Sequence, residues 1–264
     1  MLEGGDGVDR AIYDDAPGGV NVFLHLGMAN GAASSDDLAG IEDLTGSAFD
    51  DTLTGDAAAN RIEGGDGDDN IYGREGDDLL DGGEGVDTAN YWDAPAFVVV
   101  DLGSGQAALG GGTDTLTGFE NVGGSSFGDQ LIGDGSVNEI LGSGGVDTIV
   151  GQGGADVLTG GADADIFWYD AAADADDDFA VIEEITDFVS RSDVINLSAI
   201  DTDAGAPGDQ AFTFIGTDAF SATAVDEVRF SAGVIYVDTD NDVGAEMAIA
   251  LTGVASVTAA DFVP

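Results

Sequence analysis

Five consecutive blocks of nine residues occupy positions 46–90: GSAFDDTLT, GDAAANRIE, GGDGDDNIY, GREGDDLLD and GGEGVDTAN. Every block opens with glycine and carries Asp or Asn at its sixth place. The sixth places are Asp51, Asn60, Asp69, Asp78 and Asp87, and the eighth places are Leu53, Ile62, Ile71, Leu80 and Ala89. A flexible Gly/Asp-rich linker would not keep an apolar residue at one fixed place, so this period indicates a folded repeat.

Each block predicts one tight turn followed by one very short strand. Glycines at the first, second and fourth places, such as Gly64, Gly65 and Gly67, permit positive φ and expose backbone carbonyls. Places seven to nine form a strand whose central apolar side chain points inward. Two blocks therefore make one flattened coil, and stacked coils bring each turn beside the turn two blocks later.

The nonapeptide resembles the calcium-binding repeat of the RTX, or haemolysin-type, family. The resemblance implies a parallel β-roll with calcium ions between neighbouring turns. Electrostatics favours the same arrangement, because stacked carboxylates repel each other unless a cation lies between them, and calcium accepts six to eight oxygen ligands including backbone carbonyls. The stacking predicts the pairs Asp51–Asp69, Asp69–Asp87 and Asn60–Asp78, with weaker binding where Asn replaces Asp.

A second ladder of the same kind occupies residues 124–168, with sixth places at Asp129, Asn138, Asp147, Asp156 and Asp165. Its predicted pairs are Asp129–Asp147, Asp147–Asp165 and Asn138–Asp156. Tyr13 maps onto Tyr91 at the offset that also maps the first ladder onto the second, 78 residues. One unit of spacer plus ladder is therefore present nearly twice, and the spacers, roughly 13–45 and 91–123, are expected to form longer strands broken by glycine.

The expected calcium ligands are the sixth-place side chains and the glycine carbonyls of the turns. In the first ladder they are Asp51, Asn60, Gly64, Gly65, Gly67, Asp69, Gly73, Gly76, Asp78, Gly82, Gly83, Gly85 and Asp87. In the second ladder they are Asp129, Asn138, Gly142, Gly144, Asp147, Gly151, Gly153, Asp156 and Asp165. Three sites between turns in each ladder give about six calcium ions.

A further acidic loop contains Asp238, Asp240 and Asp242 in a D-x-D-x-D arrangement. This spacing is typical of a calcium loop, although Gly244 stands one place too late for an EF-hand and Ile249 occupies the position that needs Glu. A cation site and a polar hairpin turn are equally good interpretations.

Composition narrows the function. The chain has 53 Asp and Glu against 5 Lys and Arg, a formal charge of −48, which excludes nucleic acid and anionic membrane surfaces as partners. It has no cysteine, so bound metal, rather than disulfide bonds, would have to cross-link and stabilise the fold. Neither a secretory signal peptide nor a membrane-spanning run is visible. The block Gly4–Ile12 has no partner two blocks earlier, so we expect a chain cut from a longer one, with a natural start as the alternative.

The repeat stops near Tyr169, and residues 169–264 show alternating apolar strands that predict an antiparallel β domain. Their motifs resemble the C-terminal domain of serralysin-type proteases and other type I secreted proteins. That resemblance implies an uncleaved secretion signal ending in Asp261-Phe262-Val263, from which Pro264 departs because the family ends on apolar residues. We therefore expect domains at 1–168 and 169–264.

Evidence for catalysis is weak. Gly124-Ser-Ser126-Phe-Gly128 matches the hydrolase elbow, but it lies inside a nonapeptide, and the only histidine, His25, falls in a predicted spacer strand. One histidine without cysteine does not make a typical zinc site. Trp92 and Trp168 lie near the ends of the ladders, where capping of the apolar interior is favoured over a ligand platform.

The sequence thus predicts an all-β protein, a parallel β-roll in two ladders with β-spacers, followed by a sandwich-like C-terminal β domain. We expect a non-catalytic, calcium-dependent structural or adhesive protein, such as a surface-layer, filament or matrix subunit, which folds on calcium after type I secretion. The alternative is the calcium-binding secretion and folding module of a larger secreted protease, lipase or epimerase. Expected partners are calcium, the type I machinery during export, and either further copies of the chain or a cell-surface polysaccharide, at an extracellular or cell-surface location.

Overall fold

The computed structural model describes residues 1–31, 35–110, 112–169, 182–200, 212–221, 226–239, 245 and 247–263. The chain divides into two compact units, Met1–Ser126 and Phe127–Pro264. The predicted domain boundary after residue 168 stays a prediction. Among the described residues, regular structure other than strands consists of the short 3-10 helices η1 (Leu24–Leu26) and η3 (Ala259–Asp261). No helix in these described ranges is long and apolar enough to cross a membrane.

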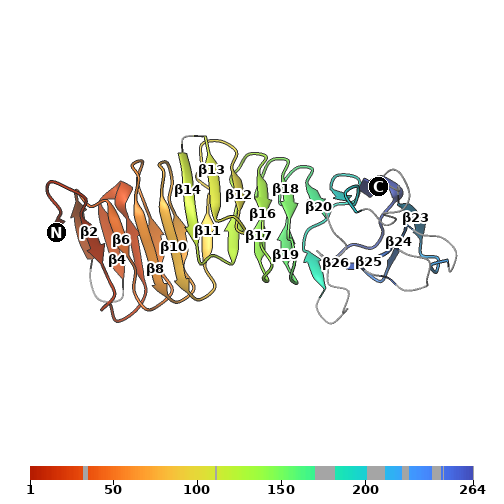
Figure 1. The fold of residues 1–264 in the computed structure, drawn as a ribbon, viewed down its shortest axis with the longest axis horizontal. Coiled ribbons are helices and arrows are strands. Elements are labelled where there is room, and N and C mark those ends of the chain that lie inside the picture. The colour runs from red at the N-terminus through yellow and green to blue at the C-terminus, as the bar shows by residue number, and fades with distance from the viewer. Residues whose placement is uncertain are drawn as a thin grey trace. The chain divides into compact units, whose positions relative to one another are not determined.

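The first unit is a flattened roll of two sheets (Figure 1). One sheet has the order β1 (Leu2–Glu3), β5 (Ser35–Ala39), β4 (Met28–Gly31), β3 (Val20–Phe23), β7 (Thr52–Thr54), β9 (Asn70–Tyr72), β11 (Thr88–Asn90) and β15 (Asn121–Gly123). The other has the order β2 (Arg10–Ile12), β6 (Asp43–Thr45), β8 (Arg61–Asp66), β10 (Leu79–Glu84), β14 (Gly112–Thr117), β13 (Gln106–Leu109) and β12 (Val99–Asp101).

The ladder strands pair in parallel, as predicted. Leu53 pairs with Ile71 in one sheet, and Ile62 pairs with Leu80 in the other. Successive blocks therefore alternate between the sheets, and their eighth-place side chains meet in the interior, where Leu53, Ile62 and Ile71 have no exposed surface. Full burial of such a side chain contributes about 1.5–3 kcal/mol, so this row is the core of the roll.

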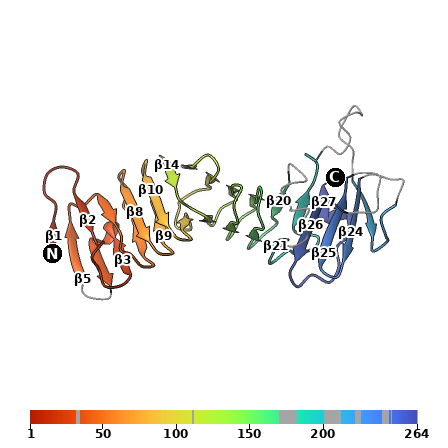
Figure 2. The ribbon, with the colours of Figure 1, turned by 60° about the horizontal axis from the view of Figure 1, so that its bottom comes forward.

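Each spacer adds an antiparallel excursion to the roll. The first forms β3, β4 and β5, and the second forms β12, β13 and β14. The two excursions belong to different sheets, because one spacer-plus-ladder unit contains an odd number of crossings between sheets. In Figure 2, β3 and β5 lie toward the bottom of this unit and β14 toward its top.

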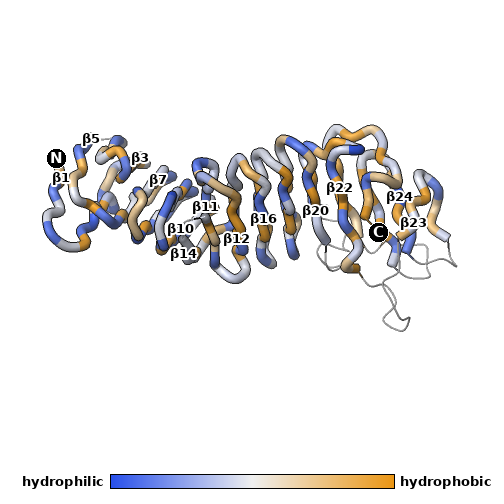
Figure 3. The backbone as a smooth tube through the Cα atoms, turned by 90° about the horizontal axis from the view of Figure 1, so that it is seen from above, coloured by the Kyte–Doolittle hydropathy of each residue, from blue (hydrophilic) through white to orange (hydrophobic). Residues whose placement is uncertain are grey.

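The second unit has the same architecture. One sheet has the order β16 (Gln130–Ile132), β18 (Thr148–Val150), β20 (Ile166–Trp168), β22 (Val194–Asn196) and β27 (Phe262–Val263). The other has the order β17 (Glu139–Leu141), β19 (Val157–Thr159), β21 (Glu183–Ile185), β26 (Met247–Leu251), β25 (Val234–Asp238), β24 (Glu227–Ser231) and β23 (Thr213–Gly216). In Figure 3, hydrophobic segments recur along β16, β20 and β22.

Parallel stacking continues beyond Tyr169, so the predicted end of the repeat is only partly correct. Leu158 pairs in parallel with Ile185, and Phe167 pairs in parallel with Ile195. β26 and β27 then extend the same two sheets in parallel, and antiparallel pairing is confirmed for β24, β25 and β26. These coils could not be predicted from the period, because the strands β20, β21 and β22 are not separated by nine residues.

Tyrosines, rather than tryptophans, close the interior at the ladder ends. Tyr91 and Tyr169 are 2% and 1% exposed, whereas Trp92 is 64% exposed and Trp168 is half-buried. The prediction that Trp92 caps the apolar interior is therefore wrong. Neighbouring residues in extended chain point to opposite sides, and Tyr91 takes the inward side.

Candidate metal centre

The sixth-place side chains line the inside of the turns. All ten are buried, with exposed fractions between 0 and 4%. The peptide N–H of Asp51 donates to Oδ1 of Asp69 (2.8 Å), and that of Asp69 donates to Oδ1 of Asp87 (2.8 Å). The same bond, at 2.7–2.9 Å, joins Asn60 to Asp78, Asp129 to Asp147, Asp147 to Asp165 and Asn138 to Asp156. The structure thus brings together all six predicted pairs.

The second carboxylate oxygen of several ladder aspartates has no donor. Within the described part of the chain, Oδ2 of Asp69, Asp78, Asp87 and Asp147 is buried without a hydrogen-bond partner. Leaving such an atom unsatisfied costs about 1–3 kcal/mol, and more if it is charged. These oxygens therefore require either a proton or a cation.

The first-place glycines mark where these oxygens point. A Cβ at Gly64 would lie 2.2 Å from Oδ2 of Asp69 and 2.3 Å from the carbonyl oxygen of Gly82 in the next coil. A Cβ at Gly142 would lie 2.3 Å from Oδ2 of Asp147 and 2.4 Å from the carbonyl oxygen of Gly160. A carboxylate oxygen and a carbonyl oxygen thus meet over each of these glycines.

The glycines have two distinct roles. Positive φ occurs at the second and fourth places, as at Gly65 (123°) and Gly67 (113°), whereas the prediction of positive φ at the first place is wrong. First-place residues Gly73, Gly82 and Gly151 share the close approach of Gly64, while Gly83, Gly85 and Gly76 share the positive φ.

Two residues on the predicted ligand list stand apart from both roles. Gly144 and Gly153 occupy third places, and the positive φ falls instead at Gly145 (102°) and Gly154 (130°). A Cβ at Gly144 would meet nothing within 4 Å. Only the first, second and fourth places of a block are therefore sterically demanding.

The first two blocks of a ladder differ from the later three. Oδ1 of Asp51 accepts hydrogen bonds from Val20 N (2.7 Å) and Ser47 Oγ (2.8 Å). The Asn60 side chain accepts from Asp56 N (2.8 Å) and donates to the carbonyl oxygen of Glu42 (2.7 Å). Protein donors thus provide hydrogen bonds to the sixth-place side chains of the first two turns. The first carboxylate oxygen that lacks a donor among the described residues of this ladder is Oδ2 of Asp69.

Asp114 is not among the ligands predicted from the sequence, and it extends a column of acidic side chains into the spacer. Asp114 is fully buried; its Oδ1 accepts from Asp78 N (3.0 Å) and its Oδ2 from the Tyr91 hydroxyl (3.2 Å). A signal was present, because Gly110-Gly-Gly-Thr-Asp114-Thr-Leu116 fits the nonapeptide at its second, fourth, sixth and eighth places. The block is in phase with the first ladder, because Asp114 follows Asp51 by a whole number of nine-residue steps, but the spacer separates the two and Leu109 stands in place of the first glycine.

Three further acidic side chains complete the columns. Oε2 of Glu120 accepts from Asp87 N (2.8 Å), Oε2 of Glu42 accepts from Asp9 N (2.9 Å), and Oδ1 of Asp193 accepts from Asp165 N (3.2 Å). Glu42 and Glu120 occupy equivalent places in the two spacers, which is the signal that could have identified them.

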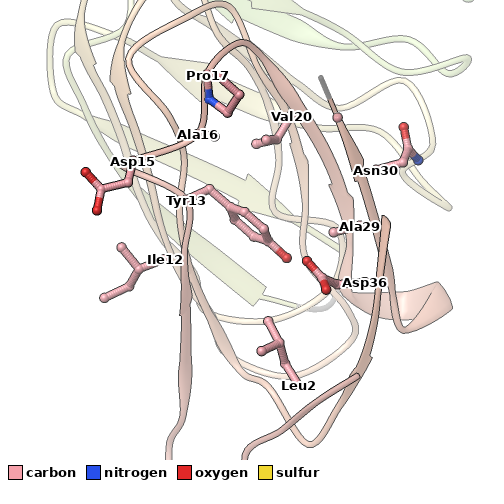
Figure 4. A pocket seen from close by; sticks show the side chains of 11 residues that line it. Leu2, Ile12, Tyr13, Asp15, Ala16, Pro17, Val20, Ala29, Asn30 and Asp36 are labelled. Carbon is pink, nitrogen blue, oxygen red and sulfur yellow. The ribbon is translucent and has the colours of Figure 1, made fainter. Parts of the chain in front are cut away.

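The first spacer contains a tyrosine–aspartate pair equivalent to Tyr91 and Asp114, but without the hydrogen bond between them that the second spacer has. Tyr13 and Asp36 correspond to Tyr91 and Asp114, and Figure 4 shows the Tyr13 hydroxyl pointing toward Asp36. In the described residues the buried Tyr13 hydroxyl has no hydrogen-bond partner, and it lies beside a cavity of about 320 Å³. Burial, together with the charge of Asp36, raises the pKa of Tyr13.

Comparison with known families decides the nature of the turns. The model of the RTX calcium-binding nonapeptide repeat matches four times, at residues 37–69, 54–89, 123–157 and 141–176. The two ladders are RTX calcium-binding repeats. A comparison with curated proteins gives no significant match.

Two solved structures resemble the chain. One is a subunit of a mannuronan C5-epimerase from Azotobacter vinelandii, with 26% identity and a TM-score of 0.24, covering 52% of this chain and 79% of that one. The other is an extracellular lipase from Serratia marcescens, with 15% identity and a TM-score of 0.26, covering 84% of this chain and 40% of the lipase.

Several of the buried carboxylates have a raised pKa while no cation is bound. Burial raises the pKa of Asp69, Asp78 and Asp147 to about 7 and that of Asp87, Asp114 and Asp165 to about 6. The peptide N–H bonds oppose this shift, and neighbouring carboxylates add to it. A cation between the turns would take the place of these protons.

The donor set of the RTX turns fits calcium. Among the described residues, no three Asp, Glu or His side chains converge on one point, so a bound ion must take several backbone carbonyls as ligands. Calcium accepts such all-oxygen shells, whereas zinc prefers nitrogen and sulfur ligands. The orphaned oxygens of Asp69 and Asp147, each facing a glycine carbonyl, are consistent with that choice.

The remaining candidates lie outside the ladders. Asp238 is fully buried at the end of β25, while Asp240 and Asp242 lie outside the described residues, so the second calcium loop stays a prediction. His25 lies in η1 rather than in a strand, and its ring packs edge-on against Phe23 with centroids 6.1 Å apart.

The terminal motif is part of the fold. Asp261 is fully buried and accepts hydrogen bonds from Ser190 Oγ (2.8 Å), Arg191 N (2.6 Å) and Thr258 N (2.6 Å). Phe262 begins β27, which pairs with β22. Its suggested role as a secretion signal stays a prediction.

Proposed function

We propose that the chain is a non-catalytic extracellular module in which the calcium-loaded RTX roll is itself the working part, as a structural or adhesive protein. The observation that carries the proposal is the column of buried carboxylates whose Oδ2 atoms face glycine carbonyls without any donor in the described residues. A fold that buries so many acidic groups needs counter-charge to persist.

The proposed calcium sites lie between the paired turns of each ladder. Their side-chain ligands are Asp69, Asp78, Asp87, Asp147, Asp156 and Asp165, with Asp51, Asn60, Asp129 and Asn138 at the opening turns. Glycine carbonyls supply the remaining oxygens. Six pairs give about six ions, and the contact between Asp78 and Asp114 adds one candidate position at the junction of ladder and spacer.

Calcium would couple folding to location. Sites of this extracellular kind have dissociation constants of roughly 10⁻⁴–10⁻³ M, so they stay empty in a calcium-poor cytosol and the buried carboxylates oppose folding there. The chain would leave the cell unfolded through a type I system and fold outside. Burial of Asp261 and Phe262 in the folded unit supports this order, because these two side chains of the terminal motif are accessible only before folding.

Two roles remain for such a module. A structural or adhesive role is supported by the duplicated spacer-plus-ladder unit, since stacked repeats suit extended assemblies. The alternative, a folding and secretion module of a larger secreted enzyme, is equally compatible with the RTX repeats.

Circular dichroism in calcium-free buffer and in millimolar calcium tests the proposal. We expect a disordered spectrum without calcium, a β spectrum with it, and about six bound ions by calorimetry. A strong β signal in calcium-free buffer at pH 8 would contradict calcium-driven folding. Electron microscopy of the loaded chain separates the roles, because ordered polymers support the structural one and dispersed monomers support the enzyme module.

A further inference from the structure

The outer face of four adjacent strands in the first unit, β3, β7, β9 and β11, carries no acidic side chain, although β5 in the same sheet carries the exposed Asp37. Strands β3, β7, β9 and β11 turn Val22, Leu53, Ile71 and Ala89 inward, so the residues beside them point outward. The residues beside them form two rungs, here called the neutral strip: Phe23, Thr54 and Tyr72 in one, of which Thr54 is only 5% exposed, and Asn21, Thr52, Asn70 and Thr88 in the other. In a chain of charge −48 such a strip is unusual.

The opposite sheet shows that the roll does not require this neutrality. Its corresponding outward positions include Asp43, Arg61, Glu63 and Asp81. Arg61 forms an ion pair with Glu63 at 2.6 Å, and Arg10 pairs with Glu63 at 3.0 Å. The two faces of one unit therefore differ in chemistry although their backbones are alike.

A groove lies at the end of the neutral strip. It is a cavity of about 270 Å³ whose lining includes Phe23, His25, Tyr72 and Trp92. Trp92 is 64% exposed, so its indole is available to a ligand. The only carboxylate in the lining, that of Asp93, is paired with Arg74 at 3.4 Å, which reduces its effect on the groove.

The second copy of the repeat shows that the fold does not demand these aromatic residues. At the offset of 78 residues, Phe23 corresponds to Asp101, His25 to Gly103, Tyr72 to Val150 and Trp92 to Asp170. The strands form in both copies, so packing does not account for the aromatic set. A cluster of rings, of which His25 and Trp92 are exposed and Phe23 and Tyr72 half-buried, that the repeat does not require indicates a binding surface.

We propose that this groove and the neutral strip bind a neutral polysaccharide. A pyranose ring has apolar C–H faces that pack on aromatic rings such as those of Trp92 and Tyr72, and hydroxyl groups that bond to Thr and Asn side chains. Parallel strands repeat at about 4.8 Å, a spacing comparable to one sugar ring, so a chain lying across the strands meets similar groups at each step. Anionic glycans are excluded by charge. The proposal requires the calcium-folded roll but not its structural role.

Affinity electrophoresis in calcium tests the proposal with hydroxyethyl cellulose, laminarin and dextran as neutral probes and alginate as the anionic probe. We expect at least one neutral probe to retard the chain and alginate to have no effect. Trp92→Ala and Tyr72→Ala should each weaken binding about tenfold or more, as anchor residues do. Phe97→Ala is the matched control, because Phe97 is 60% exposed in the same unit but outside the groove lining, and it should bind like the parent.

A fluorescence titration gives a second readout. The chain has two tryptophans, so a Trp168→Phe variant reports on Trp92 alone, and its emission should change on titration with the retarding probe. Absence of retardation by all three neutral probes overturns the proposal, as does equal weakening by Phe97→Ala. Concentration-dependent self-association that Trp92→Ala abolishes would instead assign the face to a second copy. A calcium-induced β spectrum in each variant separates lost binding from lost folding.

Discussion

Asp147 and Asp261 are both fully buried in the second unit, yet they are stabilised in opposite ways. Asp261 accepts hydrogen bonds from Ser190, Arg191 and Thr258, and these bonds outweigh burial and lower its pKa. Oδ1 of Asp147 accepts one hydrogen bond, from the peptide N–H of Asp129, and its Oδ2 has no partner among the described residues. Burial raises the pKa of Asp147 to about 7.

The difference teaches how this chain uses one residue type for two purposes. Where the protein supplies enough donors, a buried carboxylate is a permanent part of the structure. Where the protein supplies one donor and places a carbonyl oxygen near the second carboxylate oxygen, that second oxygen gains a partner only when a cation binds. The folded end of the chain and the ladders should therefore respond differently to pH, calcium and mutation.

The pH of a calcium-free solution should produce the largest effect. Folding raises the pKa of Asp69, Asp78 and Asp147 from 3.8 to about 7, so the protonated form favours the roll. The stabilisation is fully present below about pH 4 and is lost as pH rises through 6 to 7, at a few kcal/mol per group. Circular dichroism should show more β structure at pH 5 than at pH 8.

The calcium-loaded chain should show the reverse trend. Calcium needs ionised carboxylates, so its affinity should fall as pH falls below about 6. Asp261 has a lowered pKa in the folded protein, so its ionised form stabilises the fold at any pH above the pKa of the unfolded chain. That stabilisation is lost as the pH falls through the pKa of the folded state. A calcium-free chain with more β structure at pH 8 than at pH 5 would contradict the comparison.

Asp261→Ala should have the next largest effect. It leaves the peptide N–H groups of Arg191 and Thr258 without their acceptor, at a cost of about 3 kcal/mol. Urea unfolding at saturating calcium measures the loss, and calorimetry should find the number of bound ions unchanged. A drop in that number would show that Asp261 belongs to a calcium site.

Gly142→Ala should cost about 2 kcal/mol, because the new Cβ would overlap Oδ2 of Asp147 and the carbonyl oxygen of Gly160. Gly144→Ala, in the same block, is the matched control and meets open space. Thermal unfolding with calcium compares the two variants. Equal losses would mean that the space over the first glycine has no special role.

Asp147→Asn should weaken calcium binding in the second ladder about tenfold, or about 1.4 kcal/mol, because an amide replaces a charged ligand. The same change should stabilise the calcium-free roll at pH 8, since it removes a buried charge. Calcium titrations followed by circular dichroism measure both effects. A loss of stability without calcium would show that Asp147 is satisfied by the protein.

Gln152→Gly should give the smallest effect, a gain of about 0.5–1 kcal/mol. Gln152 holds a positive φ of 70° at a second place, where glycine has no steric cost. The greater freedom of glycine in the unfolded chain offsets part of the gain. Thermal unfolding in calcium should show a higher midpoint, and a lower one would mean that the side chain makes a compensating contact.

Local periodicity predicted the roll well. Nine-residue spacing gave the pairs Leu53–Ile71 and Asp51–Asp69, because parallel coils repeat their neighbours at a fixed interval. It failed where the interval changed. Asp114 reaches Asp78 across a long spacer excursion, and Ile195 reaches Phe167 only after a long connection.

Side-chain direction was the other limit. The sequence could not show which of Tyr91 and Trp92 faces inward, because both are large and apolar and the strand phase is uncertain where the period ends. The donors of Asp261 come from Ser190 and Arg191, some seventy positions away, and no local pattern encodes such a contact.

The two spacers put their hairpins in different sheets, β3 to β5 in one and β12 to β14 in the other. Duplication of this unit therefore does not copy a feature onto the same side; it transfers the feature to the opposite side. A longer array built by the same rule would carry its hairpins alternately on the two sheets. Each sheet could then acquire its own binding specificity without steric interference between successive hairpins.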